Sequence, residues 1–135
     1  MIICEEKYPK ILDEIIEFLN SGDVELVFVN SVQMYEINKA QRNLDKTTDV
    51  LSFPYQKIPN FPIGSIVINL DLAKDMAINF GHNIEDEIAL LFIHGILHIL
   101  GFDHETDSGQ MRDMEEKIIL NFNLPKSLIL RNDDE

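Results

Sequence analysis

The sequence predicts an α+β protein in which a small mixed β-sheet is covered by helices. Five segments have the apolar spacing of α-helices, and three short runs are rich in the residues that favour strands. Their order along the chain is α, β, α, β, β, α, α, α. A length of 135 residues with 45% hydrophobic residues suits a single domain, 1–135, with a disordered tail at 131–135.

A helix, a strand and a second helix are predicted at the start of the chain. The first helix runs from about Pro9 to Asn20, where proline suits the first turn and apolar residues recur on one face. The run VELVFV at 24–29 is expected to be a largely buried strand. Asn30 or Ser31 can cap the second helix, which ends near Arg42. The residues of this helix available for the core are Val32, Tyr35, Ile37 and Ala40.

Two short strands follow, DVLSF at 49–53 and IGSIVIN at 63–69. The prolines between them prevent one long strand. Because Pro54 cannot donate a hydrogen bond to a neighbouring strand, one of the two strands is expected at an edge of the sheet. A third helix then runs from about Asp71 to Phe80 and stops at Gly81.

The next helix is expected in the middle of the fold, because from Ile88 onward it is apolar on nearly all faces. Asn83 caps this helix. The acidic residues at 85–87 lie in its first turn, where they match the positive end of the helix dipole.

One more helix is predicted near the end of the chain. Ser108 can cap it, and it runs to about Phe122. Its apolar stripe contains Met111, Met114 and Ile118. The two methionines are interpreted as core residues, since imidazole metal sites rarely recruit thioethers.

Three of the four histidines lie within eleven residues, in the stretch HGILHILGFDH at 94–104. His94 and His98 are four residues apart, so both rings lie on one face of a helix. Gly101 can adopt the left-handed conformation that ends a helix, which lets the chain turn and bring His104 back to the other two. The spacing predicts a buried metal-site helix and a three-histidine site.

Three imidazoles suit one Zn²⁺ per chain, and three protein ligands leave the fourth position of a tetrahedral ion to water, as in catalytic zinc sites. The same spacing occurs in metzincin metalloproteases, where the residue after the first histidine is the glutamate that acts as general base. Here that residue is Gly95, which cannot accept a proton. The site is therefore interpreted as a zincin-like metal centre used for other chemistry.

The charge of the chain limits its partners. A net charge of -13 and a pI near 4.5 suit a soluble cytoplasmic protein and argue against binding to DNA or to membranes by bulk charge. No signal peptide is evident, and the single cysteine, Cys4, cannot form an internal disulfide. Between Ile37 and Asn60 four basic residues outnumber two acidic ones, which indicates either a phosphate-binding patch or a solvated loop. The four are Lys39, Arg42, Lys46 and Lys57.

Three segments resemble the YbeY family of bacterial endoribonucleases: INKAQRNLDKTTDVLSFPY at 37–55, IGSIVI at 63–68 and HGILHILGFDH at 94–104. The resemblance covers nearly the whole chain. It implies a zinc-dependent, single-strand-specific endoribonuclease that matures ribosomal RNA, above all the 3' end of the small-subunit RNA. It also implies a part in ribosome quality control, with ribosome or small-subunit proteins as partners.

The resemblance also assigns residues. The matching zinc ligands are His94, His98 and His104. Arg42 matches a functionally important arginine, and Arg42 and His94 are the expected catalytic residues. Ser65 follows Gly64 where the family usually has an acidic residue, so no carboxylate role is expected there.

The residues alone leave the nucleophile, the general base and two rival functions open. Asp103 is either a proton-handling group or a turn residue that bonds its own backbone. His82 is interpreted as structural, because it has no ligand-like offset from His94. One rival function is a ribosome-assembly binding factor with a structural metal. The other is a peptidase whose base is Asp103 or Glu105.

Overall fold

The computed structural model of the protein describes residues 1–126, so the tail predicted at 131–135 lies outside the described residues. A four-stranded sheet has the order β1-β2-β4-β3. The pairs β1–β2 and β2–β4 are parallel, and β3–β4 is antiparallel. The predicted α+β class with a small mixed sheet is therefore confirmed. The strands are β1 (Ile2–Ile3), β2 (Val24–Val29), β3 (Val50–Pro54) and β4 (Gly64–Asn69).

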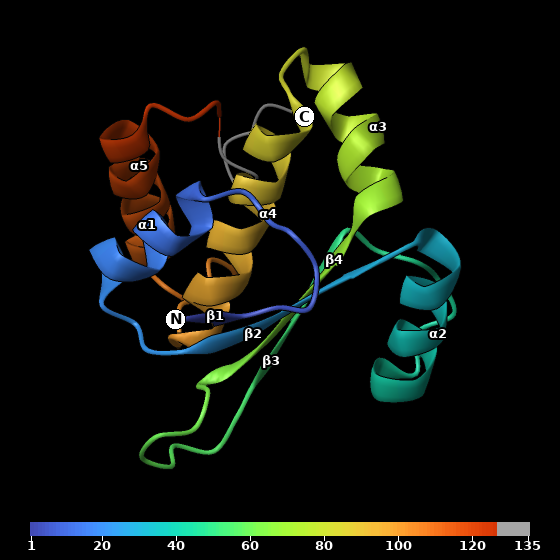
Figure 1. The fold of residues 1–135 in the computed structure, drawn as a ribbon, viewed down its shortest axis with the longest axis horizontal. Helices are drawn as coiled ribbons and strands as arrows, with labels where there is room; N and C mark the ends of the chain where they lie inside the picture. Colours follow the sequence, from blue (N-terminus) through green and yellow to red (C-terminus); the bar gives the residue numbers. More distant parts are fainter. Residues whose placement is uncertain (127–135) are drawn as a thin grey trace.

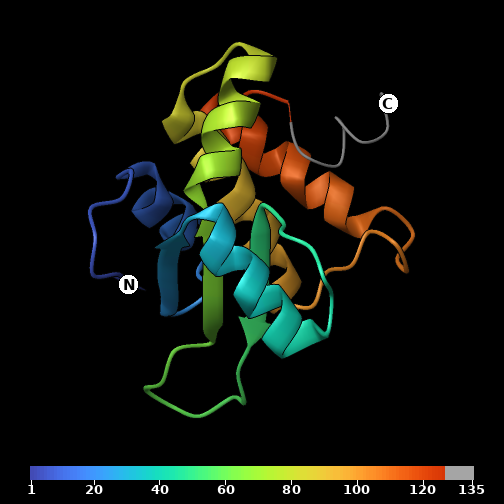
Figure 2. The same ribbon diagram turned by 90° about the vertical axis from the view of Figure 1, so that its right-hand side faces the viewer.

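Five helices cover this sheet, and their order matches the prediction. In Figure 1, α1, α4 and α5 lie on one side of the sheet and α2 lies on the other; Figure 2 shows α2 in front of the strands. The helices are α1 (Ile11–Leu19), α2 (Ser31–Arg42), α3 (Leu70–Phe80), α4 (Ile84–Ile99) and α5 (Gln110–Phe122). Strand β1 was not predicted, because a strand of two residues has no periodicity to detect.

Strand β4 is the centre of the fold and is buried along its whole length. Its side chains alternate between the two faces of the sheet. Ile66 and Ile68 belong to the main core with α1 and α4, whereas Val67 packs with Met34 and Leu51 in a smaller cluster beneath α2. Burial on both faces explains why Ile66, Val67 and Ile68 are consecutive apolar residues instead of alternating with polar ones.

Helix α4 runs through the core, as its apolar sequence predicted. The Asn83 side chain caps it by accepting a hydrogen bond from the Asp86 backbone N–H at 2.8 Å. Gly95 lets the helix approach β4 closely, since a Cβ at this position would lie 3.0 Å from Ile66 Cγ2. The buried apolar residues of α4 are Ile88, Ala89, Leu90, Leu91, Phe92, Ile93, Ile96 and Leu97.

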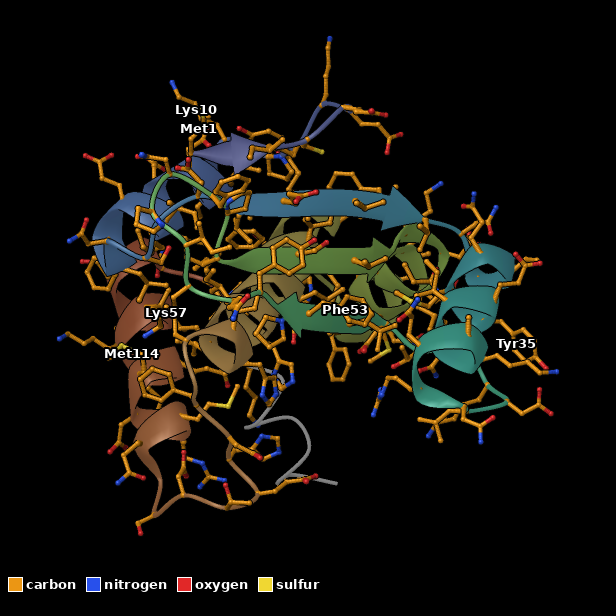
Figure 3. The ribbon with its side chains drawn as sticks, turned by 90° about the horizontal axis from the view of Figure 1, so that it is seen from below. Met1, Lys10, Tyr35, Phe53, Lys57 and Met114 are labelled. Atoms are coloured by element: carbon orange, nitrogen blue, oxygen red, sulfur yellow. The ribbon has the colours of Figure 1, made fainter. Side chains whose placement is uncertain are left out.

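Two predicted features are confirmed, the edge strand and the turn after α4. Strand β3 forms an edge of the sheet, although it begins and ends one residue later than predicted and so includes Pro54; Figure 3 shows its labelled residue Phe53. Gly101 has a φ angle of 99°, so the chain turns there after α4 as the spacing of the histidines required.

Two details of the predicted helices are wrong. Ser108 does not cap α5: Gly109 holds the N-cap position, and the Asp107 carboxylate before it accepts hydrogen bonds from the backbone N–H groups of Gly109 and Met111. On α2, Val32 and Ala40 are exposed instead of buried. The helix turns Met34 and Asn38 inward, and the buried Asn38 side chain donates a hydrogen bond to the Lys46 carbonyl at 2.9 Å.

Within residues 1–126, every helix is too short or too polar to traverse a lipid bilayer.

Candidate metal centre

The last two turns of α4 and the loop after it bring the three histidines of the motif together. The ring centroids of His94 and His98 are 4.6 Å apart, and that of His104 lies 6.0 and 6.4 Å from them. The Nε2 atoms of His94 and His98 face each other at 3.1 Å. Two nitrogens bound to one tetrahedral zinc ion, each at about 2.0–2.1 Å, are separated by roughly 3.3 Å. This pair therefore has the spacing of two ligands of one ion.

The third ligand is less well placed than the pair. Within residues 1–126, no group of three or more His, Cys, Asp or Glu side chains is arranged so that it could hold a metal ion as it stands. His94 and His98 are fixed by the buried helix, whereas His104 comes from the loop after Gly101, whose path is not set by helical geometry. The fold thus preorganises two of the three predicted ligands, and metal binding by all three histidines stays a prediction.

Unsatisfied ring nitrogens support a role beyond packing. The Nδ1 atoms of His94 and His104 are buried and have no hydrogen-bond partner in the described part of the chain. Most buried polar side-chain atoms in folded proteins are hydrogen-bonded, so such exceptions call for an explanation. The fold therefore leaves hydrogen-bonding capacity of these rings unused, while the paired Nε2 atoms of His94 and His98 are the ones spaced to share a metal ion.

The surroundings of His98 favour its neutral ring, which is the form that binds metals. Burial lowers the pKa of His98 below its ordinary value, and the neighbouring rings of His94 and His104 lower it further. Asp103 and a backbone hydrogen bond with Phe102 act in the opposite direction. Desolvation is the largest of these effects.

The histidines line a cavity of about 450 Å³ that also contains the predicted arginine. Arg42 reaches it from the last residue of α2, although it lies 52 residues before His94 in the sequence. It is exposed, and within residues 1–126 it forms no salt bridge. Besides these four residues, the cavity is lined by Val50, Leu51, Ser52, Pro54, Gly95, Asp103 and Glu105.

Two carboxylates belong to the same cavity. Asp103 Oδ1 accepts a hydrogen bond from the Glu105 backbone N–H at 3.0 Å, and the Asp103 carbonyl accepts from the backbone N–H groups of Thr106 and Asp107. Asp103 therefore has the bonds of a turn residue, the simpler of its two predicted roles. Glu105 follows it at the rim, so both candidate bases lie near the histidines.

The remaining basic residues do not gather into one patch. Lys39 pairs with Asp45 at 3.8 Å on the surface, and Lys57 lines a different cavity. Of the four residues proposed for a phosphate-binding patch, only Arg42 lines the histidine cavity. Ser65 is buried in β4 and does not line it either.

His82 lies outside the cavity, as expected for a structural residue. Its Nε2 forms a hydrogen bond of 2.8 Å with Glu87 Oε1, and its ring stacks on Phe80. The sequence did not indicate that Glu115 of α5 is buried. This carboxylate is 1% exposed and lies 3.7 Å from His94 Nδ1. Its only signal was a position four residues after Met111 and three before Ile118, on the buried face of α5.

Comparison with known proteins agrees with the resemblance seen in the sequence. The model of the family described as Endoribonuclease YbeY matches residues 3–123. A protein of Campylobacter fetus named Endoribonuclease YbeY is 60% identical over 132 residues, which cover 98% of each chain. A Helicobacter pylori protein of the same name is 56% identical over 111 residues, or 82% of this chain and 79% of its own.

A solved structure supports the fold. The solution structure of a Thermotoga maritima protein superimposes with a TM-score of 0.61 at 25% sequence identity. The match covers 88% of this chain and 87% of that protein. The α+β arrangement is thus shared well beyond the relatives of high identity.

Proposed function

The chain belongs to the YbeY family of endoribonucleases, and on that premise we propose that it is a zinc-dependent, single-strand-specific endoribonuclease. Its proposed substrate is precursor ribosomal RNA, above all the 3' end of the small-subunit RNA. The proposed setting is the cytoplasm, where the protein would meet ribosome or small-subunit proteins and take part in ribosome quality control. The observation that carries the catalytic proposal is the convergence of Arg42 and three histidines on one cavity.

His94, His98 and His104 would hold the zinc ion. Bound there, it would supply Lewis acidity towards a phosphoryl oxygen and make water a better nucleophile near neutral pH. Neutral imidazoles leave the full charge of the ion available to an anionic substrate. Because His94 and His98 lie on a buried helix, their rings are held in place before the substrate arrives.

Arg42 is the proposed phosphate-binding residue. Its guanidinium carries a permanent charge and can donate two parallel hydrogen bonds to phosphate oxygens. Among the described residues that line the cavity it is the one Lys or Arg, and no salt bridge within residues 1–126 competes for it. A donor fixed beside the reacting phosphate stabilises the charge that develops in the transition state.

The strongly acidic chain makes this local charge important. With a net charge of -13, the protein repels RNA over most of its surface, so binding must depend on a few well-placed groups. Loss of Arg42 should therefore affect cleavage far more than loss of an exposed lysine elsewhere.

One observation favours the peptidase alternative: the carboxylates of Asp103 and Glu105 line the cavity. A general base must come within hydrogen-bond reach of the attacking water. Incubation with denatured protein separates the two activities: peptide fragments would favour the peptidase, and their absence together with RNA cleavage would favour the nuclease.

The decisive experiment measures cleavage of single-stranded and duplex RNA of matched sequence by the purified protein, with and without a chelator. Cleavage confined to the single strand, lost on chelation and restored by zinc, is the expected result. His98→Ala, purified in the same way, controls for contaminating nuclease. Cleavage that persists in that variant or survives chelation would contradict the proposal, and tight RNA binding without cleavage would favour an assembly factor.

A further inference from the structure

Helix α5 carries a buried carboxylate that the proposed mechanism does not use. Glu115 is 1% exposed and lies on the inner face of α5, between the core residues Met111 and Ile118. Its Oε2 atom has no hydrogen-bond partner within residues 1–126. A buried carboxylate without partners is costly, so one placed in an apolar stripe needs a compensating interaction.

The group that Glu115 approaches is the first histidine of the motif. Its Oε1 lies 3.7 Å from His94 Nδ1, and this ring nitrogen is also buried without a partner in the described part of the chain. The separation exceeds a hydrogen bond, which for such a charged pair is about 2.7–2.9 Å. A small side-chain rotation would close it, because both groups face the contact between α4 and α5.

The orientation of the His94 ring makes this contact meaningful. Its Nε2 points to His98 Nε2 at 3.1 Å, so Nε2 is the atom directed at the shared metal position. Nδ1 then points away from that position and towards α5. A neutral imidazole carries one proton, and a hydrogen bond to one nitrogen determines which nitrogen keeps the lone pair.

We propose that Glu115 is a positioning residue for His94: its carboxylate accepts the Nδ1–H hydrogen bond and so leaves the Nε2 lone pair free to bind metal. This inference rests on the proposed metal centre and adds a partner from a different helix. Carboxylates in such a position orient the ring of a ligating histidine and raise its basicity. The backbone at Phe102 offers His98 a hydrogen-bonding partner, whereas His94 Nδ1 has no hydrogen-bond partner among the described residues.

The first test measures zinc affinity by competition with a chromophoric chelator. Glu115→Gln keeps the size of the side chain but removes its charge, and it should weaken zinc binding by about 10- to 100-fold. The matched control is Glu116→Gln, the adjacent and less buried glutamate of the same helix, which should bind zinc like the wild type. Melting temperatures of the chelated proteins show whether folding itself has changed.

The second test does not depend on whether the Glu115 variant folds, because it uses the wild-type protein. In the metal-free wild type, the ring ¹⁵N chemical shifts of His94 should show a protonated Nδ1 and an unprotonated Nε2, with His94→Gln identifying its signals. A ring protonated at Nε2 would overturn the inference. So would equal zinc affinity in the wild type and Glu115→Gln, even if RNA cleavage depends on zinc. A wild-type protein that binds no zinc would overturn both this inference and the proposed metal centre.

Discussion

The two ends of helix α4 place histidines in opposite situations. Just before its first turn, the His82 ring is bonded to the fully buried Glu87 at 2.8 Å and stacked on Phe80. At its last turns, the rings of His94 and His98 crowd together, and His94 Nδ1 lies 3.7 Å from Glu115 without a hydrogen bond. Within residues 1–126, the first end is satisfied by hydrogen bonds of the fold, whereas the second, unsatisfied end holds buried polar atoms without a hydrogen-bond partner.

This difference separates a structural histidine from a functional one better than burial does. Both ends are largely hidden from solvent, and at both a histidine lies close to a buried glutamate. What differs is whether the hydrogen-bonding capacity is used up within the fold. Unsatisfied buried groups carry a free-energy cost, so their presence around the His94–His98 pair calls for an explanation in function.

The largest expected effect tests this contrast directly. His98→Ala should remove most of the zinc, because the pair with His94 loses one of its two preorganised ligands. His82→Ala, at the satisfied end of the same helix, should retain about one zinc per chain. Metal analysis of both purified variants is the measurement. Full zinc occupancy in His98→Ala would remove this residue from the site.

Arg42 extends the comparison to substrate binding at the unsatisfied end. Arg42→Ala should keep its fold and its zinc but cleave RNA about 10- to 1000-fold more slowly, the range for loss of one charge-stabilising donor. Arg42→Lys should recover part of the loss, since an ammonium cannot form two parallel hydrogen bonds. Cleavage, zinc content and melting temperature are measured on the same preparations. An unchanged rate would exclude Arg42 from the active site, and lost zinc would make it structural.

The sequence predicted helix α4 and the turn after it well because their signals are local. The apolar helix, its Asn83 cap, the i, i+4 histidine pair and the turn at Gly101 all depend on residues a few positions apart. Backbone geometry alone then brings His94 and His98 together. The placement of Arg42 in their cavity is a tertiary contact across the sheet, and the sequence indicated it only through resemblance to a family.

The details that the sequence did not reveal involve polar groups in apolar surroundings. Asn38 on α2 and Glu115 on α5 are buried, while Val32 on α2 is 68% exposed. Hydrophobic periodicity assigns each of these residues to the wrong face, because it ranks side chains by polarity and cannot anticipate a specific hydrogen-bond partner. Asn38 is buried because the Lys46 carbonyl is within reach, a contact that depends on how the following loop folds back.

The Gly95→Glu variant tests whether the missing glutamate is what separates this site from that of a metzincin protease. A Cβ there would lie 3.0 Å from Ile66 on β4, so Gly95→Glu should force α4 away from the sheet and reduce the free energy of unfolding by about 3 kcal/mol. It should not produce efficient peptide cleavage. Denaturant unfolding and a peptide-hydrolysis assay check the two expectations. Strong peptide cleavage would show that the missing glutamate was the sole barrier.

A substitution at the satisfied end of α4 should lower the stability of the protein and leave its zinc binding unchanged. Removal of the ring in His82→Ala takes away the 2.8 Å partner of a carboxylate that is 0% exposed, which should lower the free energy of unfolding by about 1–3 kcal/mol. The measurement is denaturant unfolding in the presence of a chelator. If His82→Ala lost more free energy of zinc binding than free energy of unfolding, the two ends of α4 would be coupled, and the contrast between them would not hold.

The smallest expected effect comes from a hydrogen-bonded pair near the surface, and it shows how strongly burial changes the stabilisation that such a pair provides. The Tyr8 hydroxyl donates a hydrogen bond to Asp13 Oδ1 at 2.8 Å near the surface, so Tyr8→Phe should cost only about 0.5 kcal/mol, less than His82→Ala. Burial, followed by the hydrogen bond to Asp13 and its charge, raises the pKa of Tyr8 above 10.0. The folded protein therefore holds this proton at pH values where the unfolded chain releases it, and the stabilisation present below pH 10 is lost as the pH rises through the folded pKa. Tyr8→Phe should show a shallower loss of stability above that pH in denaturant titrations, and identical slopes for the two proteins would mean that the hydrogen bond contributes nothing.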